Sequence, residues 1–379
     1  MRSIYWAVII PTALFLSCRS NHGSPTSDIF IDSFAEESNM DYFRDVYSDI
    51  RVVPLNLGDH LLGSTSTLRV DDADGRFLLT DRQTGSIYLL NKDGSLGSYI
   101  AKVGRGPGEY SEIQHAIYRN HRVIVLADGS HIIEYTESGE MVREAVFDEW
   151  ITDITPLGED EYALFLYRNS GENDIEDRII ITDSAFVKKQ SFLPLAFQLF
   201  SYGALTSRVT GQNDQYICVQ QSSPLVYKCN RDTILTTYHF DFHGKEYPKP
   251  LLESDDYETI LNILTTTPVI YSVANVFESP DYLLFVLCQL IDGEESRIGQ
   301  WLIEKESMTS RLEYQNLSGP VFQFFGPPQM LTADKEVVYV CEASLFETVK
   351  DFVPGLSKLQ EAFDNNPFGN VILFCTIGE

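Results

Sequence analysis

Short runs of apolar and β-branched residues, each followed by a polar turn, recur along most of the chain. The two clearest copies are Arg76–Asp81 with Ser86–Gly94, and Arg122–Ala127 with His131–Gly139. Their closing glycines stand 45 residues apart. In each copy a β-rich run, a polar turn, a second run and a turn that ends in Gly follow one another, which is typical of a β-meander.

Weaker copies of the same pattern continue towards the carboxy terminus. They begin near Ile151, Tyr202, Val273 and Phe324. Six repeats of roughly 40 to 50 residues are more typical of a propeller than of a sandwich. The pattern therefore predicts an all-β fold, a six-bladed β-propeller of four-stranded antiparallel blades that spans residues 43–379.

The two ends of the repeat region complement each other. The last copy is one strand short, and a spare strand, Ile50–Asn56, precedes the first copy. If this strand pairs with Val371–Ile377, both chain ends share one blade and no long sheet edge stays open. Pro54 is compatible with this arrangement only on an outer strand, where one side of the backbone makes no ladder hydrogen bonds.

Two segments interrupt the repeat with helical patterns. Residues 245–268 contain an acidic stretch followed by an apolar stripe at helical spacing, and residues 345–363 carry a similar stripe around Pro354-Gly355. We expect two short helical insertions, which lie in connections between strands and cover the ends of blades.

The amino-terminal residues have the architecture of an export signal. Arg2 precedes Ile4–Leu16, an almost wholly apolar run too short for a membrane-spanning helix, which needs about 20 residues. The run closes with Ser17-Cys18, which resembles the lipobox of bacterial lipoproteins. This resemblance implies removal of residues 1–17, acylation of Cys18 and attachment to a membrane. The polar residues that follow, 18–42, are typical of a flexible tether.

The charge balance excludes one class of partner. The chain has 55 acidic and 28 basic side chains, and its formal charge is −27. Because sequence-independent binding to nucleic acid depends on Lys and Arg that neutralise phosphates, we expect no nucleic-acid partner.

Five cysteines remain after Cys18. Cys218 and Cys229 lie symmetrically about a possible hairpin loop, which would place them opposite each other and allow a disulfide; Cys341 and Cys375 allow a similar pairing. The alternative, which the composition favours, is that all five are small buried apolar residues. The spacing does not indicate zinc.

One glycine-rich run stands out in the connection after the first repeat. It consists of Gly104, Arg105, Gly106, Pro107, Gly108, Glu109 and Tyr110. A phosphate-binding loop would need a following Gly-Lys-Ser/Thr and a helix start, and neither is present. The run instead predicts a tight turn between two blades, stiffened by Pro107, with Tyr110 packed beneath it.

Together with the lipobox and with Asn366-Pro367 before the last strand Val371–Phe374, this run resembles the six-bladed β-propeller lipoproteins of Bacteroidota. The resemblance covers roughly residues 45–379 and implies a propeller in the cell envelope. The function of that family is largely unknown, so the resemblance implies no catalytic residues. Phe368-Gly369 departs from the family pattern at the local turn.

Two further patterns are weak candidates for a metal site. Asp71–Gly75 resembles the start of a calcium loop, but residue 81 is Asp81 in place of the required Glu, so a solvated turn is favoured. His239, Asp241 and His243 alternate with phenylalanines and would share one face of a strand, which a half-buried outer strand also explains. We therefore predict no metal and no cofactor.

Three classes of function are compatible with the sequence. The favoured one is a lipid-anchored binding or scaffold module for a protein, peptide or glycan, located at the outer membrane and facing the periplasm because no early acidic cluster follows Cys18. The alternatives are a lactonase- or lyase-type enzyme with a metal in the central channel, and a structural component of the envelope. The enzyme would need convergent ligands on the innermost strands, and these candidate segments show no repeated ligand type. They lie near Leu68, Ile117, Ile154, Leu205, Asn275 and Met330.

Overall fold

A computed structural model describes most of the chain beyond its amino-terminal region. The described residues are 27–32, 46–63, 68–73, 75–167, 177–194, 209–212, 214–219, 223–231, 233–246, 248, 256–291, 295–350, 356–365 and 369–378. The predicted signal sequence, Cys18 and most of the predicted tether lie outside these residues.

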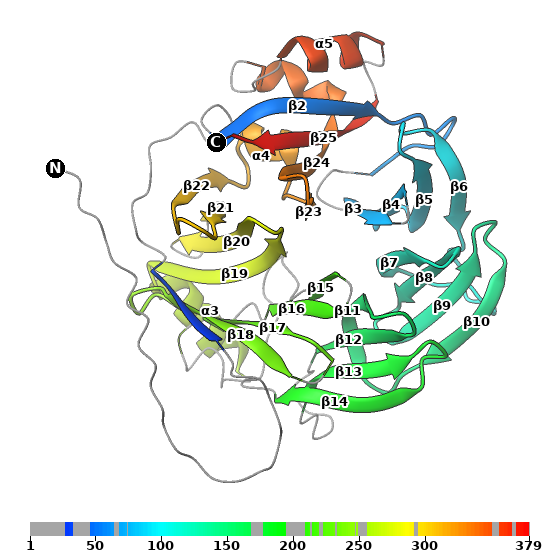
Figure 1. Cartoon of the computed structure of the whole chain (residues 1–379), viewed down its shortest axis with the longest axis horizontal. Helices are drawn as coiled ribbons and strands as arrows, with labels where there is room; N and C mark the ends of the chain where they lie inside the picture. The colour runs from blue at the N-terminus through cyan, green and yellow to red at the C-terminus, as the bar shows by residue number, and fades with distance from the viewer. Residues whose placement is uncertain are drawn as a thin grey trace.

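Six blades, each built on four antiparallel strands, form a ring, which confirms the predicted six-bladed propeller (Figure 1). In blades 1 to 5 the first strand of each repeat lies innermost and the following three strands succeed it outwards, whereas in blade 6 the outermost strand comes from the amino-terminal side of the repeats. The strands of blades 1 to 3 are β3 (Leu68–Ala73), β4 (Arg76–Asp81), β5 (Ser86–Asn91) and β6 (Leu96–Ala101); β7 (Ile113–Arg119), β8 (Arg122–Ala127), β9 (His131–Thr136) and β10 (Met141–Val146); and β11 (Trp150–Leu157), β12 (Glu161–Tyr167), β13 (Asp177–Asp183) and β14 (Lys188–Pro194).

The second half of the ring follows the same plan. The strands of blades 4 to 6 are β15 (Val209–Gln212), β16 (Gln215–Val219), β17 (Leu225–Cys229) and β18 (Ile234–Asp241); β19 (Val269–Glu278), β20 (Tyr282–Ile291), β21 (Glu295–Glu304) and β22 (Ser310–Asn316); and β23 (Met330–Leu331), β24 (Glu336–Glu342), β25 (Asn370–Ile377) and β2 (Tyr47–Pro54).

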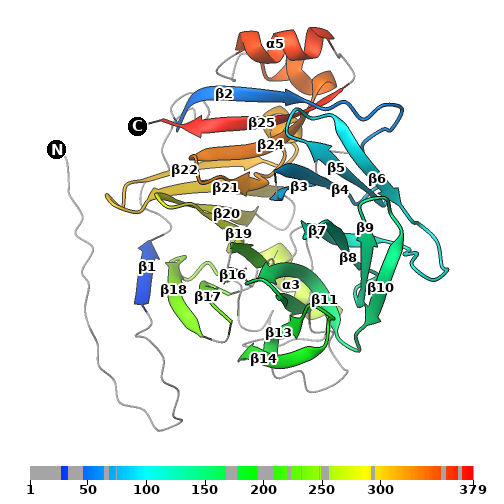
Figure 2. The same cartoon turned by 45° about the vertical axis from the view of Figure 1, so that its right-hand side comes forward.

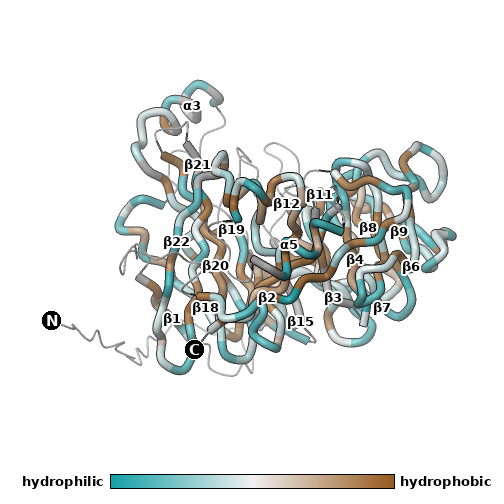
Figure 3. The backbone as a smooth tube through the Cα atoms, turned by 90° about the horizontal axis from the view of Figure 1, so that it is seen from above, coloured by the Kyte–Doolittle hydropathy of each residue, from teal (hydrophilic) through white to brown (hydrophobic). Residues whose placement is uncertain are grey.

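The hydrophobic core is divided into six clusters, one at each interface between neighbouring blades. Strand β4 shows why. Phe77 and Leu79 pack towards blade 6, while Leu78, on the opposite face of the same strand, packs towards blade 2. Because both faces of a blade are covered, its middle strands read as continuous apolar runs, and hydrophilic residues gather in the turns (Figure 3).

The ring is closed as the sequence predicts. Strand β2 pairs antiparallel with β25, so residues from the two ends of the chain share blade 6, and the two strands lie side by side in Figures 1 and 2. Pro54 lies opposite Val371 at the end of β2, which is the outer strand of the blade. The missing backbone N–H of proline therefore interrupts no ladder on a central strand.

Helices occur in both predicted insertions. Helix α3 (Tyr257–Thr266) begins after Asp256, whose carboxylate accepts a hydrogen bond from the Thr259 backbone N–H at 3.0 Å. The second insertion contains the 3₁₀-helix η2 (Ala343–Thr348) and helix α5 (Leu356–Asn365), which packs on β2.

One short helix was not predicted. Helix α4 (Pro320–Phe325) lies where the sixth repeat was expected to begin, near Phe324, and the first strand of that blade starts only at Met330. Phe324 and Phe325 are buried between blades 5 and 6. A short apolar run of this kind fits a buried strand and a buried helix equally well, so periodicity alone gave the wrong element.

The amino-terminal strand β1 (Ser27–Asp32) is also a departure from the prediction. It adds to the outer side of β18 as a fifth, parallel strand of blade 4. These six residues lie within the segment 18–42 that was expected to be a flexible tether, so the tether prediction does not hold for them.

Candidate functional site

The glycine-rich run Gly104–Tyr110, called the connector below, joins β6 of blade 1 to β7 of blade 2. Its two ends are held together by the backbone: the Tyr110 N–H donates to the Lys102 carbonyl at 3.0 Å, and the Gly104 N–H donates to the Tyr110 carbonyl at 2.9 Å. A turn inside the loop is closed by the Glu109 N–H, which donates to the Gly106 carbonyl. The connector is therefore a folded loop with fixed ends.

Two of its glycines lie in close contacts. A Cβ atom on Gly104 would meet the carboxylate of Glu109, which folds back over the loop and accepts the Gly106 N–H at 2.7 Å. Gly108 has φ +67°, and a Cβ atom there would lie 2.7 Å from the sulfur of Met141. Glycine is the residue that fits both the left-handed backbone and the contact with β10.

Two buried tyrosines fix the connector from below. Tyr110 has no exposed surface, and its hydroxyl donates to the Gly85 carbonyl at 2.8 Å. Tyr135, on β9, donates to the Gly108 carbonyl at 2.7 Å. Burial raises the pKa of both phenols, so both stay protonated and able to donate at physiological pH.

Exposed apolar side chains occur within this loop, just before it, and at the start of β10, the strand whose Met141 lies next to Gly108. Val103, just before the connector, is 56% exposed, and Met141 and Val142 at the start of β10 are each 44% exposed. Pro107, inside the connector, is exposed as well. We call Val103, Pro107, Met141 and Val142 the connector surface.

Buried polar side chains occur on three of the innermost strands. In β7, β11 and β19 the ladder register shifts by one residue, and the residues just after these bulges are His115, Asp153 and Asn275. All three are at most 5% exposed. They occupy equivalent positions in their blades. The repeats in the sequence did not reveal this, because each bulge adds a residue and shifts the spacing between the copies.

Their contacts indicate a structural role. The Asp153 carboxylate accepts from the Ile154 N–H at 3.0 Å, and the Asn275 side-chain oxygen accepts from the Val276 N–H at 2.9 Å. These side chains serve backbone donors next to the bulges. His115 Nδ1 lies 3.6 Å from Asp153 Oδ1, which brings blades 2 and 3 together at their inner strands.

The segments proposed to line the channel belong to the innermost strands. The residues found there are Leu68 in β3, Ile117 in β7, Ile154 in β11, Asn275 in β19 and Met330 in β23. Leu205 lies outside the described residues. Within the part of the chain that is described, no three His, Cys, Asp or Glu side chains come close enough to hold a metal ion.

The residues of the two weak metal motifs, Asp71–Gly75 and His239–His243, lie at the hairpin of β3 and β4 and at the end of β18. Ala73 at the end of β3 is paired with Arg76 at the start of β4, and Asp74 and the side chains of Asp71 and Asp72 lie outside the described set. His239 Nε2 lies 3.0 Å from Asp28 of β1, whereas the Asp241 carboxylate accepts the His243 backbone N–H. The two histidines therefore do not share one ligand position.

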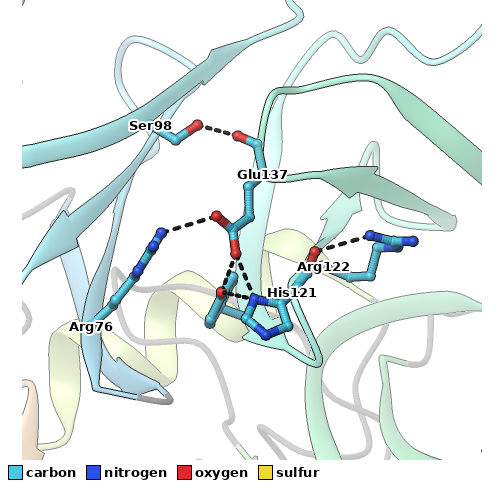
Figure 4. Close-up of polar contacts among 6 residues, drawn as sticks. Arg76, Ser98, His121, Arg122 and Glu137 are labelled. Atoms are coloured by element: carbon cyan, nitrogen blue, oxygen red, sulfur yellow. Dashed lines mark hydrogen bonds and ion pairs between the residues drawn. The ribbon is translucent and has the colours of Figure 1, made fainter.

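A second polar cluster joins the hairpin turns of blades 1 and 2 (Figure 4). The Glu137 carboxylate accepts from Arg76 at 3.1 Å, from the hydroxyl of Tyr118 and from His121 Nδ1 at 2.9 Å. Ser98 donates to the Glu137 carbonyl. The hydrogen bonds from Tyr118 and His121 lower the pKa of Glu137, so this carboxylate is held ionised and fastens two blades together.

The cysteines do not form the proposed disulfides. Cys218, Cys229, Cys288, Cys341 and Cys375 are all free. In the hairpin of β16 and β17, Cys218 lies opposite Tyr227 and Cys229 lies opposite Tyr216, so the register differs by two residues from the symmetric hairpin that the pairing required. Cys341 and Cys375 are likewise paired with other residues, Val371 and Val337.

No helix among the described residues is both long enough and apolar enough to cross a membrane.

Comparison with known proteins places the chain in a family. A model of the family described as "Domain of unknown function (DUF4934)" matches residues 26–371. The chain belongs to the DUF4934 family. None of the curated proteins matches this DUF4934 chain.

Solved structures from Bacteroides share the fold of this DUF4934 protein. A Bacteroides fragilis NCTC 9343 protein described as a candidate exported protein has a TM-score of 0.71 and 16% identity, with 93% of this chain and 100% of that chain covered. A member of the DUF4221 family from Bacteroides vulgatus ATCC 8482 has a TM-score of 0.54 and 9% identity, with 88% and 98% covered. At these identities the likeness extends to the fold.

Proposed function

We propose that this DUF4934 protein is a lipid-anchored propeller of the cell envelope that binds a protein or peptide partner through the connector surface. The observation that carries the proposal is an exposed apolar surface on a rigid support. Its side chains lie in the connector, directly before it, or at the start of β10 next to Gly108, and the connector backbone is fixed at both ends and from below by Tyr110 and Tyr135. A preorganised surface loses little conformational entropy on binding, which favours affinity.

The chemistry of the connector surface fits a polypeptide better than a glycan. Its side chains are aliphatic or, at Met141, a thioether, and none offers the flat aromatic ring on which a sugar stacks. Methionine is enriched in protein interfaces and adapts to the shape of a partner. The sequence allows a protein, peptide or glycan partner, and we therefore propose a protein or peptide.

Charge adds a second requirement on the partner. Glu109, Glu140 and Glu144 are exposed near the connector surface, but so are Lys102 and Arg105, whereas the whole chain carries a formal charge of −27. A basic partner would therefore be steered towards the protein at low salt by the charge of the whole chain.

The envelope location rests on the amino-terminal signal and on Cys18. A likeness in fold to a Bacteroides protein described as a candidate exported protein supports export. Acylation of Cys18 would hold the propeller at a membrane, and we propose the periplasmic face of the outer membrane. Each buried acyl methylene contributes about 0.8 kcal/mol to such attachment.

The test is affinity capture from envelope extracts with the tagged, lipidated protein and two matched variants. Val142→Glu places a charge in the connector surface, and Val187→Glu places the same charge on another exposed valine, in blade 3, which is 56% exposed against 44% for Val142. We expect a stoichiometric protein partner with the wild type and with Val187→Glu, and its loss with Val142→Glu. Equal recovery with all three proteins would place the partner elsewhere and reject the proposed surface.

A further inference from the structure

Strand β1 is attached to blade 4 by side chains as well as by its backbone. All six of its residues are paired in parallel register with β18, from Ser27 opposite Thr236 to Asp32 opposite Asp241. The hydroxyls of Ser27 and Thr236 lie 2.9 Å apart, and Asp28 Oδ1 lies 3.0 Å from His239 Nε2. β1 therefore belongs to the folded propeller.

The two faces of β1 have different environments. Ile31 is 5% exposed and joins the core between blades 4 and 5, and Ile29 packs partly against the same core. On the opposite face, the ring of Phe30 stacks on His239 with centroids 4.6 Å apart, yet Phe30 remains 76% exposed. A large aromatic side chain is thus held on the outside of blade 4 by a strand that is itself fixed.

The position of β1 in the sequence limits how far the propeller can lie from an anchored Cys18. Nine residue steps separate Cys18 from Ser27, so a fully extended chain spans about 30 Å. If β1 were not docked, the first fixed point would be near Val46, and the corresponding limit would be about 95 Å. Docking of β1 shortens the maximum reach to about one third.

We propose that the outer edge of blade 4, formed by β1 and β18, is the surface of the propeller that faces the phospholipid bilayer, with Phe30 at the lipid headgroups. This inference rests on the proposed acylation of Cys18. Three observations favour a bilayer as the occupant of this edge: the short distance to the anchor, the fixed orientation of β1, and an exposed aromatic ring, a side-chain type that is favourable at membrane interfaces.

The arrangement would also place the connector surface away from the membrane. Blades 1 and 4 lie on opposite sides of the six-bladed ring, with β6 and β18 far apart in Figure 1. Val103, next to the connector, would then project into the aqueous compartment, where a partner could reach it. The membrane side and the proposed binding side would be separated by the width of the propeller.

Spin-label accessibility measures this orientation directly. Phe30→Cys and Val103→Cys variants of the full lipidated protein are labelled with a nitroxide and reconstituted in phosphatidylcholine vesicles. Collision of the label with oxygen, which concentrates in lipid, is compared with collision with a water-soluble nickel chelate. We expect the ratio of oxygen to nickel collision to be several-fold higher at position 30 than at position 103, and equal, water-like ratios at both positions would overturn the proposal.

Hydrogen exchange separates the docking of β1 from the anchoring of Cys18. The amides of residues 27–32 that donate to β18, which are alternate residues in an edge strand, should exchange slowly in the wild type and rapidly in Ile31→Asp, while blades 1 to 3 remain protected in both. In that variant the label at position 30 should move freely in water. Fast exchange of β1 in the wild type would overturn the inference even if Cys18 is acylated. An unmodified Cys18 in the mass spectrum of the membrane-extracted protein would instead remove the proposed anchor, and the membrane-facing arrangement with it.

Discussion

Val52 of β2 lies directly opposite Leu373 of β25 in the ladder that closes the ring. The contact joins residues from the two ends of the chain within one blade. Further contacts hold the same strand: Arg51 forms an ion pair with Glu336 at 3.0 Å, and the hydroxyl of Tyr47 lies 2.9 Å from that of Tyr339. Strand β2 is therefore part of the structural core of blade 6.

Truncating Leu373 should destabilise the propeller more than truncating Val52, its partner in the ladder that closes the ring. Leu373 is fully buried, whereas Val52 is half-buried on the outer strand. We expect Leu373→Ala to lower the free energy of unfolding by about 2–5 kcal/mol, because it leaves a cavity in the core. Val52→Ala should cost less. Urea unfolding followed by tryptophan fluorescence measures both, and a cost for Leu373→Ala no larger than for Val52→Ala would contradict the observed burial.

Removal of the negative charge at Glu137 should have a pH-dependent cost. The folded-state pKa of this carboxyl lies below its ordinary value because Tyr118 and His121 donate hydrogen bonds to it. Its contribution to stability is therefore present above the ordinary glutamate pKa of about 4.3 and is lost as the pH falls through the lowered folded value. Glu137→Gln should be less stable than the wild type at pH 7, and the two should converge in acid.

Urea unfolding of the wild type and of Glu137→Gln at a series of pH values measures the difference in their free energies of unfolding. Arg76→Ala serves as a companion variant, since it removes only one of the three donors and should keep part of the pH dependence. A difference between the wild type and Glu137→Gln that stays constant from neutral pH into acid would show that the carboxylate charge is not what fastens the two blades.

The energetic cost of crowding Met141 can be measured by comparing Gly108→Ala with the same substitution at Gly244. Gly108 and Gly244 both have positive φ, +67° and +76°, but a Cβ atom on Gly244 would meet nothing within 4 Å. Gly244→Ala should therefore cost only the backbone strain, about 1–2 kcal/mol. Gly108→Ala should cost more, because it also displaces Met141. Thermal unfolding of the two variants tests this, and adding Met141→Ala to Gly108→Ala should recover the excess.

The five cysteines that the structure describes should be unreactive in the folded protein. Burial raises the pKa of Cys229 to about 12 and that of Cys288 to about 11, and it raises those of Cys341 and Cys375 well above the ordinary value. The reactive thiolate is therefore scarce at pH 8. Ellman's reagent should titrate these five thiols rapidly in denaturant and slowly without it. Fewer than five in denaturant would indicate a disulfide.

The repeat pattern and the closing strand could be predicted because both follow from local residue properties. Apolar runs such as Arg76–Asp81 and Arg122–Ala127 are separated by turns that end in glycine, and the missing strand at one end matches the spare strand at the other. The turn at Gly104–Tyr110 could also be predicted, since no Gly-Lys-Ser/Thr and no helix start follow its glycines, and Tyr110 at its end was expected to pack beneath it.

Other features depend on contacts that leave no local signal. The segment containing Ser27–Asp32 is flanked by polar residues and reads as a tether, and only the open edge of β18 makes it a strand. The positions of His115 and Asp153 become equivalent only when the bulges are counted, and the residues opposite Cys218 and Cys229 depend on the register between β16 and β17. Each of these is decided by tertiary structure.

Site-specific photocrosslinking tests the central claim, binding through the connector surface, most directly. A photoreactive amino acid is placed at Val142 or, as the comparison site, at Met308, which is similarly exposed at 46% but lies in a turn of blade 5. Irradiation of cells that express the lipidated chain should give one discrete protein adduct from position 142 and none from position 308. No adduct from position 142, or the same adducts from both positions, would contradict the claim.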